Sequence, residues 1–346
     1  MKETHSGPDA RRTMSRTFAT LLLALVLGGS LIALPIEDLL TLEAQARRAE
    51  TAEARVEALE AIAALQVEGE PAQARITQSL AIGLSDDAPD VRKRTAALLD
   101  HTQHAETAVR VLAKATRSEL KAWNKAGEKL NAFYTSGKAS KLLESYWTEA
   151  EAGVAGAVDH RDAYNEQIAK HMAEIGIHAG VLDGYIAQLA TWPDDRSVGA
   201  LSVLLKEFSE GQLAESEVVR ICLKRSTRVS EALLILGSQD ALESLVDSLM
   251  SWDKRAARSE KTLGKMRDAK PGEYGPWEIN YAESNVRDLQ AHLTKDRKSL
   301  KEFASANDLP RPPGALAKKS AWRSWKGKAR GKLPKKLGTV SVAEQE

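Results

Sequence analysis

From about residue 50 onward, apolar residues recur at the spacing of amphipathic helices, and short polar breaks separate one such run from the next. In the segment 55–65, for example, Val56, Leu59 and Ile62 fall on one helical face. No convincing strand-like alternation occurs, and aromatic residues make up only 5% of the chain. Strands favour β-branched and aromatic residues. The pattern therefore predicts an all-α fold and argues against a β-sandwich or barrel.

Proline, glycine and acidic residues indicate where these helices begin and end. Pro71 and Pro89 each open a helix, and the acidic break at 85–87 closes the run between them. Longer helices are expected from Arg117 to about Leu189, with a break near 136–137. The turns are short throughout, which predicts helices stacked on their sequence neighbours.

Three segments share a sequence pattern in which a turn is followed by apolar residues at helical spacing, which we call the ladder. They are 84–99, a segment starting at Trp192, and 229–249, with a weaker copy starting at Ala54. The step from the Ala54-Arg55 pair to Val91-Arg92 is 37 residues, and the step from Val198 to Val229 is 31. Such periods predict one pair of antiparallel helices per unit.

These segments resemble the HEAT-repeat family, in particular its short bacterial form, called HEAT-like or PBS-lyase-like. The resemblance covers about residues 50–116 and 190–250, and the segment 117–190 between them is irregular. It implies an α-solenoid in which stacked antiparallel helix pairs share a continuous core. It also implies that the turn aspartate caps the next helix and that a ladder arginine bonds it. The expected structural ladder is Pro89, Val91, Arg92, Val198, Val229 and Gly237.

The N-terminal segment 1–36 has the pattern of an export signal. Arg11, Arg12 and Arg16 precede an uncharged apolar run from Phe18 to Ile36. One interpretation is a cleaved signal peptide, favoured only slightly, and the other is a membrane anchor, because the full run is about long enough to span a bilayer. Both predict an exported protein, either periplasmic or held at the cytoplasmic membrane.

The last quarter of the chain differs from the repeats. Residues 251–308 are expected to form a charged helical hairpin after the helical-repeat domain 37–250. Residues 309–346 form a basic tail that contains two tryptophans. Ten Lys and Arg against two Glu give Pro310–Glu346 a charge of +8, and since the whole chain carries +1, residues 1–309 carry −7.

The tail is the feature for which a binding partner can be named by its chemistry. Cations beside stacking aromatics suit anionic lipid or an anionic envelope polymer, and export ranks nucleic acid below both. An equally weighted interpretation is that the tail folds back on the acidic body, with its tryptophans covering the last apolar end; a fully solvated tail is the third alternative. The binding residues expected for the first interpretation are Lys318, Lys319, Trp322, Arg323, Trp325, Lys326, Lys328, Arg330 and Lys332.

Residues suited to catalysis or metal binding are sparse. His160, His171 and His178 return to nearly one face of a helix, but the last two lie about 10 Å apart there, too far to share one ion. The lone Cys222 lies in an apolar helix and is expected to be buried and inert. We therefore expect no enzyme, cofactor or metal. The predicted function is a protein-binding scaffold of the cell envelope with an unidentified protein partner, and the alternative is an adaptor that binds anionic lipid or polymer through its tail.

Overall fold

The computed structural model describes residues 36–154, 156–211, 216–270, 273–314 and 317–338. Within these ranges the chain is all-helical, as predicted, and contains no strand. No helix among them is long and apolar enough to cross a membrane. The apolar run predicted to be a signal or anchor lies almost entirely outside the described residues. The elements are α2 (Ile36–Arg48), α3 (Ala52–Ala63), α4 (Glu70–Ser79), η1 (Leu80–Ser85), α5 (Pro89–Leu98), η2 (Leu99–His101), α6 (Ala105–Thr135), α7 (Lys138–Glu151), α8 (Ala157–Leu189), α9 (Asp195–Glu210), α10 (Ser216–Leu236), α11 (Gln239–Arg267), α12 (Pro276–Ala306) and α13 (Lys319–Arg330).

Local capping signals set the helix boundaries. The carboxylate of Asp194 accepts a hydrogen bond from the backbone N–H of Arg196 at 2.7 Å and caps α9. The hydroxyl of Ser238 accepts from the N–H of Ala241 at 3.1 Å and caps α11. Just before it, Gly237 ends α10 with a φ of 64°, a conformation that costs glycine little. The predicted turns at 194 and 237 are confirmed.

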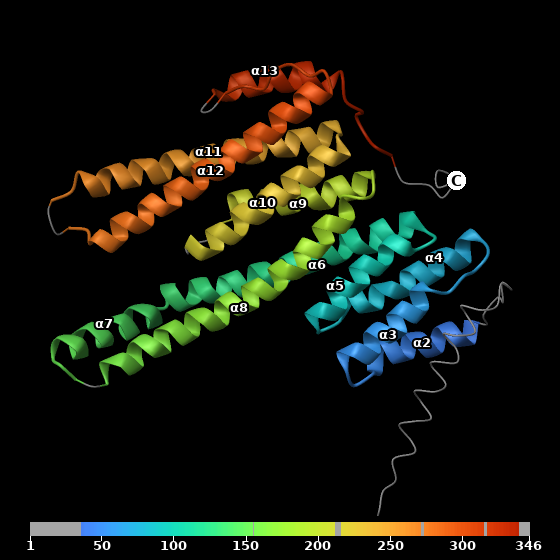
Figure 1. The fold of residues 1–346 in the computed structure, drawn as a ribbon, viewed down its shortest axis with the longest axis horizontal. Helices are drawn as coiled ribbons and strands as arrows, with labels where there is room; N and C mark the ends of the chain where they lie inside the picture. Colours follow the sequence, from blue (N-terminus) through green and yellow to red (C-terminus); the bar gives the residue numbers. More distant parts are fainter. Residues whose placement is uncertain (1–35, 155, 212–215, 271–272, 315–316, 339–346) are drawn as a thin grey trace, which may run out of the picture.

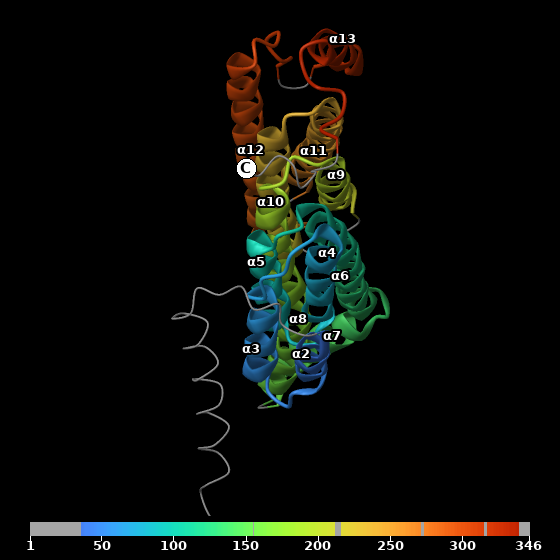
Figure 2. The same ribbon diagram turned by 90° about the vertical axis from the view of Figure 1, so that its right-hand side faces the viewer.

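The helices pack as two rows, with one helix of each pair in each row (Figure 1). One row runs α2, α4 with η1, α6, α9, α11 and α13, and the other runs α3, α5, α8, α10 and α12. Each helix contacts the next in its own row, and its pair partner lies across from it. The quarter-turn view shows the resulting column, with α2 and α3 at one end and α13 at the other (Figure 2). One hydrophobic core runs along its length.

The two rows correct the alignment of the predicted ladder. Val91 and Val229 lie on α5 and α10 in the same row, but Val198 lies on α9 in the other row. The 37-residue step does join successive helices of one row, α3 and α5, whereas the 31-residue step joins the two partners of one pair. An acidic turn followed by an apolar ladder marks any capped helix start, so it does not distinguish the first helix of a pair from the second.

The irregular segment 117–190 forms a long hairpin. Helix α6 continues to Thr135 and is followed by α7, and α8 returns along both. The far end of this hairpin projects on the same side of the column as the tip of the α11–α12 hairpin (Figure 1). Trp123 anchors the hairpin in the core, where its ring meets that of Phe208 edge-on at 5.4 Å between centroids.

The charged hairpin does not begin where the sequence predicts. Helix α11 runs without a break from Gln239 to Arg267 and passes through position 250, where the repeats were expected to end. Its first half packs in the row and its second half pairs with α12. Nothing near position 250 breaks the helix, because Leu249 and Trp252 continue the same buried face on either side of it.

A buried polar cluster holds α12 against α10. The carboxylate of Asp296 accepts hydrogen bonds from the hydroxyls of Ser230 at 3.1 Å and Thr227 at 3.3 Å. The Thr227 hydroxyl also lies 2.9 Å from Nδ1 of His292. Burial raises the pKa of Asp296 from 3.8 to about 6 and lowers that of His292 from 6.5 to about 4. Both shifts favour the neutral forms.

Replacing Asp296 should change how the stability of the chain depends on pH, because its buried carboxyl holds a proton in the folded state. The folded chain holds a proton on Asp296 up to about pH 6, so the stability contributed by this group is lost as the pH rises from about 4 through 6. Asp296→Asn mimics the neutral acid. Two pKa units correspond to about 3 kcal/mol, so the free energy of unfolding of Asp296→Asn, relative to the parent, should rise by up to about 3 kcal/mol between pH 4 and 7.

Urea titrations at several pH values measure this difference. Asp268→Asn is the control, because it makes the same substitution at an exposed residue, the C-terminal cap of α11. A pH-independent difference for Asp296→Asn would show that its carboxyl titrates normally.

Candidate functional site

Two hollows lie side by side along the junction of α4 and η1 in the first row. The first, of about 570 Å³, lies between α2 and η1, and the second, of about 380 Å³, lies between η1 and α6. They share five lining residues, so they adjoin along η1, and we call the two hollows together the η1 groove. The shared residues are Gln78, Ala81, Ser85, Asp86 and Asp87.

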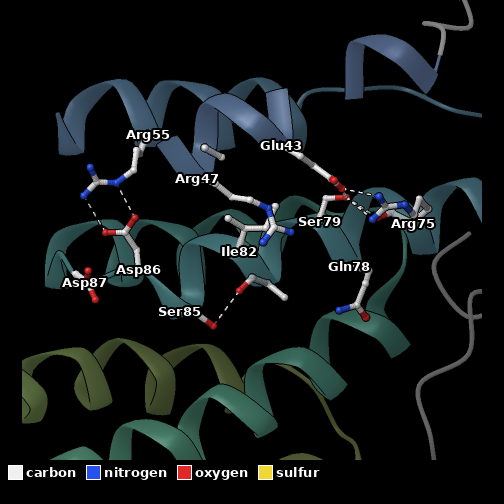
Figure 3. Close-up of a pocket in the computed structure, with 12 residues that line it drawn as sticks. Glu43, Arg47, Arg55, Arg75, Gln78, Ser79, Ile82, Ser85, Asp86 and Asp87 are labelled. Atoms are coloured by element: carbon white, nitrogen blue, oxygen red, sulfur yellow. Dashed lines mark hydrogen bonds and ion pairs between the residues drawn. The ribbon is translucent and has the colours of Figure 1, made fainter. Parts of the chain in front are cut away.

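Ion pairs between successive elements shape the first hollow (Figure 3). Arg55 of α3 binds both carboxylate oxygens of Asp86, at 2.6 and 3.0 Å. Asp86 also accepts from the backbone N–H of Ala88 at 2.8 Å. The ion pair thus ties α3 to the turn that precedes α5. At the other end, Glu43 of α2 binds Arg75 of α4 at 2.7 Å.

The second hollow contains a buried acid with two basic partners. Glu119 of α6 lies 3.1 Å from Nε of Arg92 and 2.7 Å from Nδ1 of His178. Arg92 also donates to the backbone carbonyls of Asp86 at 2.6 Å and Asp87 at 2.9 Å. Arg92 therefore bonds the turn through its carbonyls and not through the aspartate side chain. These contacts join α5, α6 and α8 at one point.

The charges of the η1 groove fall into two groups. Glu43, Asp86 and Glu119 are each bound by an arginine, so they fix the shape of the groove. Arg47 and Lys114 are exposed and make no ion pair within the described residues, and the carboxylate of Asp87, although it feels the charge of Arg55, forms no hydrogen bond or close ion pair there. In Figure 3 Arg47 reaches over the hollow toward Ile82. These unpaired groups are available to a ligand, which makes the groove suited to binding a polar or charged partner.

The predicted ladder residues have structural roles. Val91, Val198 and Val229 are buried in the core. Pro89 opens α5 and Gly237 ends α10. Arg92 alone of this set also lines the groove.

The tail folds back on the body, which is the second of the interpretations weighed above. Helix α13 packs on α11, and the rings of Trp322 and Trp325 are 1% and 4% exposed, in edge-on contact with each other. Neither ring is therefore available to stack on a ligand, because both fill the apolar end of the column. Nε1 of Trp325 donates to the carbonyl of Pro310 at 2.6 Å.

The cations of the tail divide by helix face. Lys326 pairs with Asp247 at 3.2 Å, Arg330 pairs with Glu243, and Lys332 donates to the carbonyl of Asp308. The others among the predicted binding residues are exposed and form no ion pair within the described residues: Lys318, Lys319, Arg323 and Lys328.

The histidines and the cysteine of the sequence analysis do not converge. His160 lies 3.1 Å from Glu149, His171 packs near the ring of Phe133, and His178 belongs to the groove. Among the described residues no group of three or more His, Cys, Asp or Glu could hold a metal. Cys222 is buried, as predicted, and burial raises the pKa of its thiol to about 12.

Sequence reasoning did not find the η1 groove. His178 and Glu119 are 59 positions apart, and no local pattern signals their contact. The acidic turn at 86–87 is predicted only as a helix cap, and this is wrong in detail, because the N-cap of α5 is Ala88 and no side chain caps that helix. A signal that could have helped is the exposed run of basic residues on α6 beside the groove, which recurs at helical spacing.

Comparisons with known proteins add little to this description. No protein-family model and no curated protein matches the chain. A crystal structure of an engineered protein is similar over 85% of this chain and 98% of that one, at 13% identity and a TM-score of 0.18. A TM-score this low carries no argument, so the function has to be argued from the chain's own contacts.

Proposed function

We propose that this chain is a non-enzymatic protein-binding scaffold built as a HEAT-like α-solenoid. The two rows of helices, in which each pair packs on the next, support the solenoid. So does the ion pair between Arg55 and Asp86, which ties α3 to the turn that precedes α5. We keep the expectation that the protein is exported, because the N-terminal run predicts it.

The observation that carries the binding role is the η1 groove. Its two hollows adjoin along η1 between α2 and α6, and Glu43, Asp86 and Glu119 are each bound by an arginine, whereas Arg47, Asp87 and Lys114 form no close ion pair within the described residues. A preformed groove with a few unpaired charges can fix the orientation of a protein segment while contacts along the groove provide affinity. The partner's segment would lie across successive helical elements, with no bond made or broken.

Affinity capture from envelope extracts tests this role. The immobilised full-length chain should retain a specific protein, and Ser85→Trp should release it, because the indole would fill the space that both hollows share. The expected loss of retained partner is at least tenfold. Thr294→Trp places the same side chain at an exposed site on α12 and should leave capture unchanged. Equal capture by the parent and Ser85→Trp would contradict the proposal.

The unpaired cations of α13 support a second candidate, an adaptor that binds anionic lipid or polymer. Lys318, Lys319, Arg323 and Lys328 are exposed on a docked helix. Reversing all four to glutamate keeps Trp322 and Trp325 in place, so it separates charge from folding. Sedimentation with phosphatidylglycerol vesicles should then fall at least tenfold at low salt. Unchanged sedimentation would exclude this candidate.

A further inference from the structure

A row of basic residues follows the exposed face of α6 beside the η1 groove. Arg110, Lys114, Arg117, Lys121 and Lys125 recur at spacings of three or four residues, which places them on one face of the helix. All five are exposed. At about 1.5 Å per residue the row is about 22 Å long. We call it the α6 basic stripe.

The stripe is unusually free of neutralising partners. The last four of its cations make no ion pair within the described ranges, and Arg110 donates instead to the side-chain oxygen of Gln78 at 3.2 Å. Between Glu106 and Glu128 the only acid on α6 is Glu119, and it is buried under Arg92 and His178. Four like charges therefore lie along one helix face without compensation, which costs free energy until an anionic partner arrives.

The stripe and the groove meet at Lys114. This residue belongs to the stripe and also lines the second hollow, followed one turn later by Ser118. Half-buried alanines from η1 and α6 line the same hollow: Ala81, Ala115 and Ala122. A ligand on the stripe can thus place an apolar side chain beside these alanines while its acids face the cations.

We propose that the stripe and the second hollow together bind an acidic amphipathic segment of a protein. This inference rests on the proposed scaffold function and names the chemistry of its partner. Carboxylates spaced along the segment pair with Lys114, Arg117 and Lys121, and an apolar side chain enters the hollow. The stripe supplies charge complementarity and thereby the association rate and the orientation of the segment.

The groove itself favours a peptide over a phosphate polymer. Asp86 and Asp87 line both hollows, and the exposed Asp87 carboxylate forms no hydrogen bond within the described residues. A carboxylate there repels a phosphate chain that lies across the groove but can accept hydrogen bonds from backbone N–H groups of a peptide. The described residues that line the two hollows include no Phe, Tyr or Trp, the side chains on which single-stranded nucleic acids stack.

Peptide selection on the full-length chain tests the proposal. A random twelve-residue display library should yield sequences rich in Asp and Glu that also carry apolar residues. The triple variant Lys114→Glu, Arg117→Glu, Lys121→Glu should bind the selected peptides at least tenfold more weakly by fluorescence anisotropy. A matched triple, Lys224→Glu, Lys261→Glu, Lys301→Glu, makes the same charge change at exposed lysines elsewhere and should bind within about twofold of the parent, since exposed charges at a distance are screened.

The outcomes separate the possible sources of binding. Selected peptides that are neutral or basic, no selected peptide at all, or equal losses in the two triples would overturn the proposal. Poly-glutamate of equal length or phosphatidylglycerol vesicles that compete as well as the selected peptides would show a general polyanion surface and would also overturn it. If Ser85→Trp abolishes protein capture while the stripe variants do not, the scaffold function stands and only the acidic partner fails. If neither has an effect, both fail.

Discussion

Trp322→Ala should release the C-terminal helix from the column. The indole of Trp322 is 1% exposed and meets Trp325, and both lie in the core that joins α13 to α11. Removing a buried tryptophan side chain costs about 3 to 5 kcal/mol. The ion pairs of Lys326 and Arg330 with α11 are partly exposed, and such pairs contribute too little to hold the helix in place alone.

Limited trypsin digestion and urea unfolding measure the effect. The many Lys and Arg of the tail should be cut at least tenfold faster in Trp322→Ala, because an undocked helix is accessible to the protease. Arg323→Ala is the control on the solvent face of the same helix, and surface substitutions of this kind change stability by only about 0.5 kcal/mol. Equal digestion rates for Trp322→Ala and the parent would mean that α13 is not held by its tryptophans.

Gly83→Ala should destabilise the N-terminal half of the column. A Cβ at position 83 would overlap the hydroxyl of Thr95 and lie 2.5 Å from Cδ1 of Leu59. Both neighbours are fully buried and cannot move aside. The glycine therefore marks a close approach of η1 to α3 and α5. Overpacking of this kind costs about 3 kcal/mol.

Denaturant unfolding of three variants tests this close approach. Gly176→Ala makes the same substitution in the middle of α8, where nothing lies within 4 Å of the added methyl. It should stabilise the chain by about 0.5 to 1 kcal/mol, because alanine favours a helix. The double variant Gly83→Ala, Thr95→Ala should recover part of the loss, because the hydroxyl is removed. A stability for Gly83→Ala at or above that of the parent would show that the junction has room.

The boundaries of the helices were largely readable from local chemistry. Ser238 and Asp194 cap helices through their own side chains, and Gly237 adopts a positive φ that suits it. Each of these signals acts within a few residues, so it can be recognised in the sequence without knowledge of the tertiary contacts. The same holds for the 37-residue step between α3 and α5, which follows from two consecutive helix pairs of similar length.

The row to which a helix belongs depends on contacts between distant elements. Val198 carries the same apolar ladder as Val91, yet α9 and α5 lie in different rows. Both rows need one buried face per helix, so the apolar pattern is the same in each. The tail is a second example of a pattern that fits two structures. Its two tryptophans could stack on a ligand or fill a hydrophobic core, and the packing of α13 on α11 places them in the core.

By itself the sequence determined that this chain is helical, where most helices begin and end, and that its tail is basic, because propensity, capping and charge are properties of short segments. Only the tertiary structure decided which helices share a row, that α13 closes the column, and that Glu119, Arg92 and His178 meet beside the η1 groove. Those features depend on contacts between segments that lie far apart in the sequence. Apolar faces must cover one another and buried charges must find partners, and both requirements arise only when the folded chain excludes water.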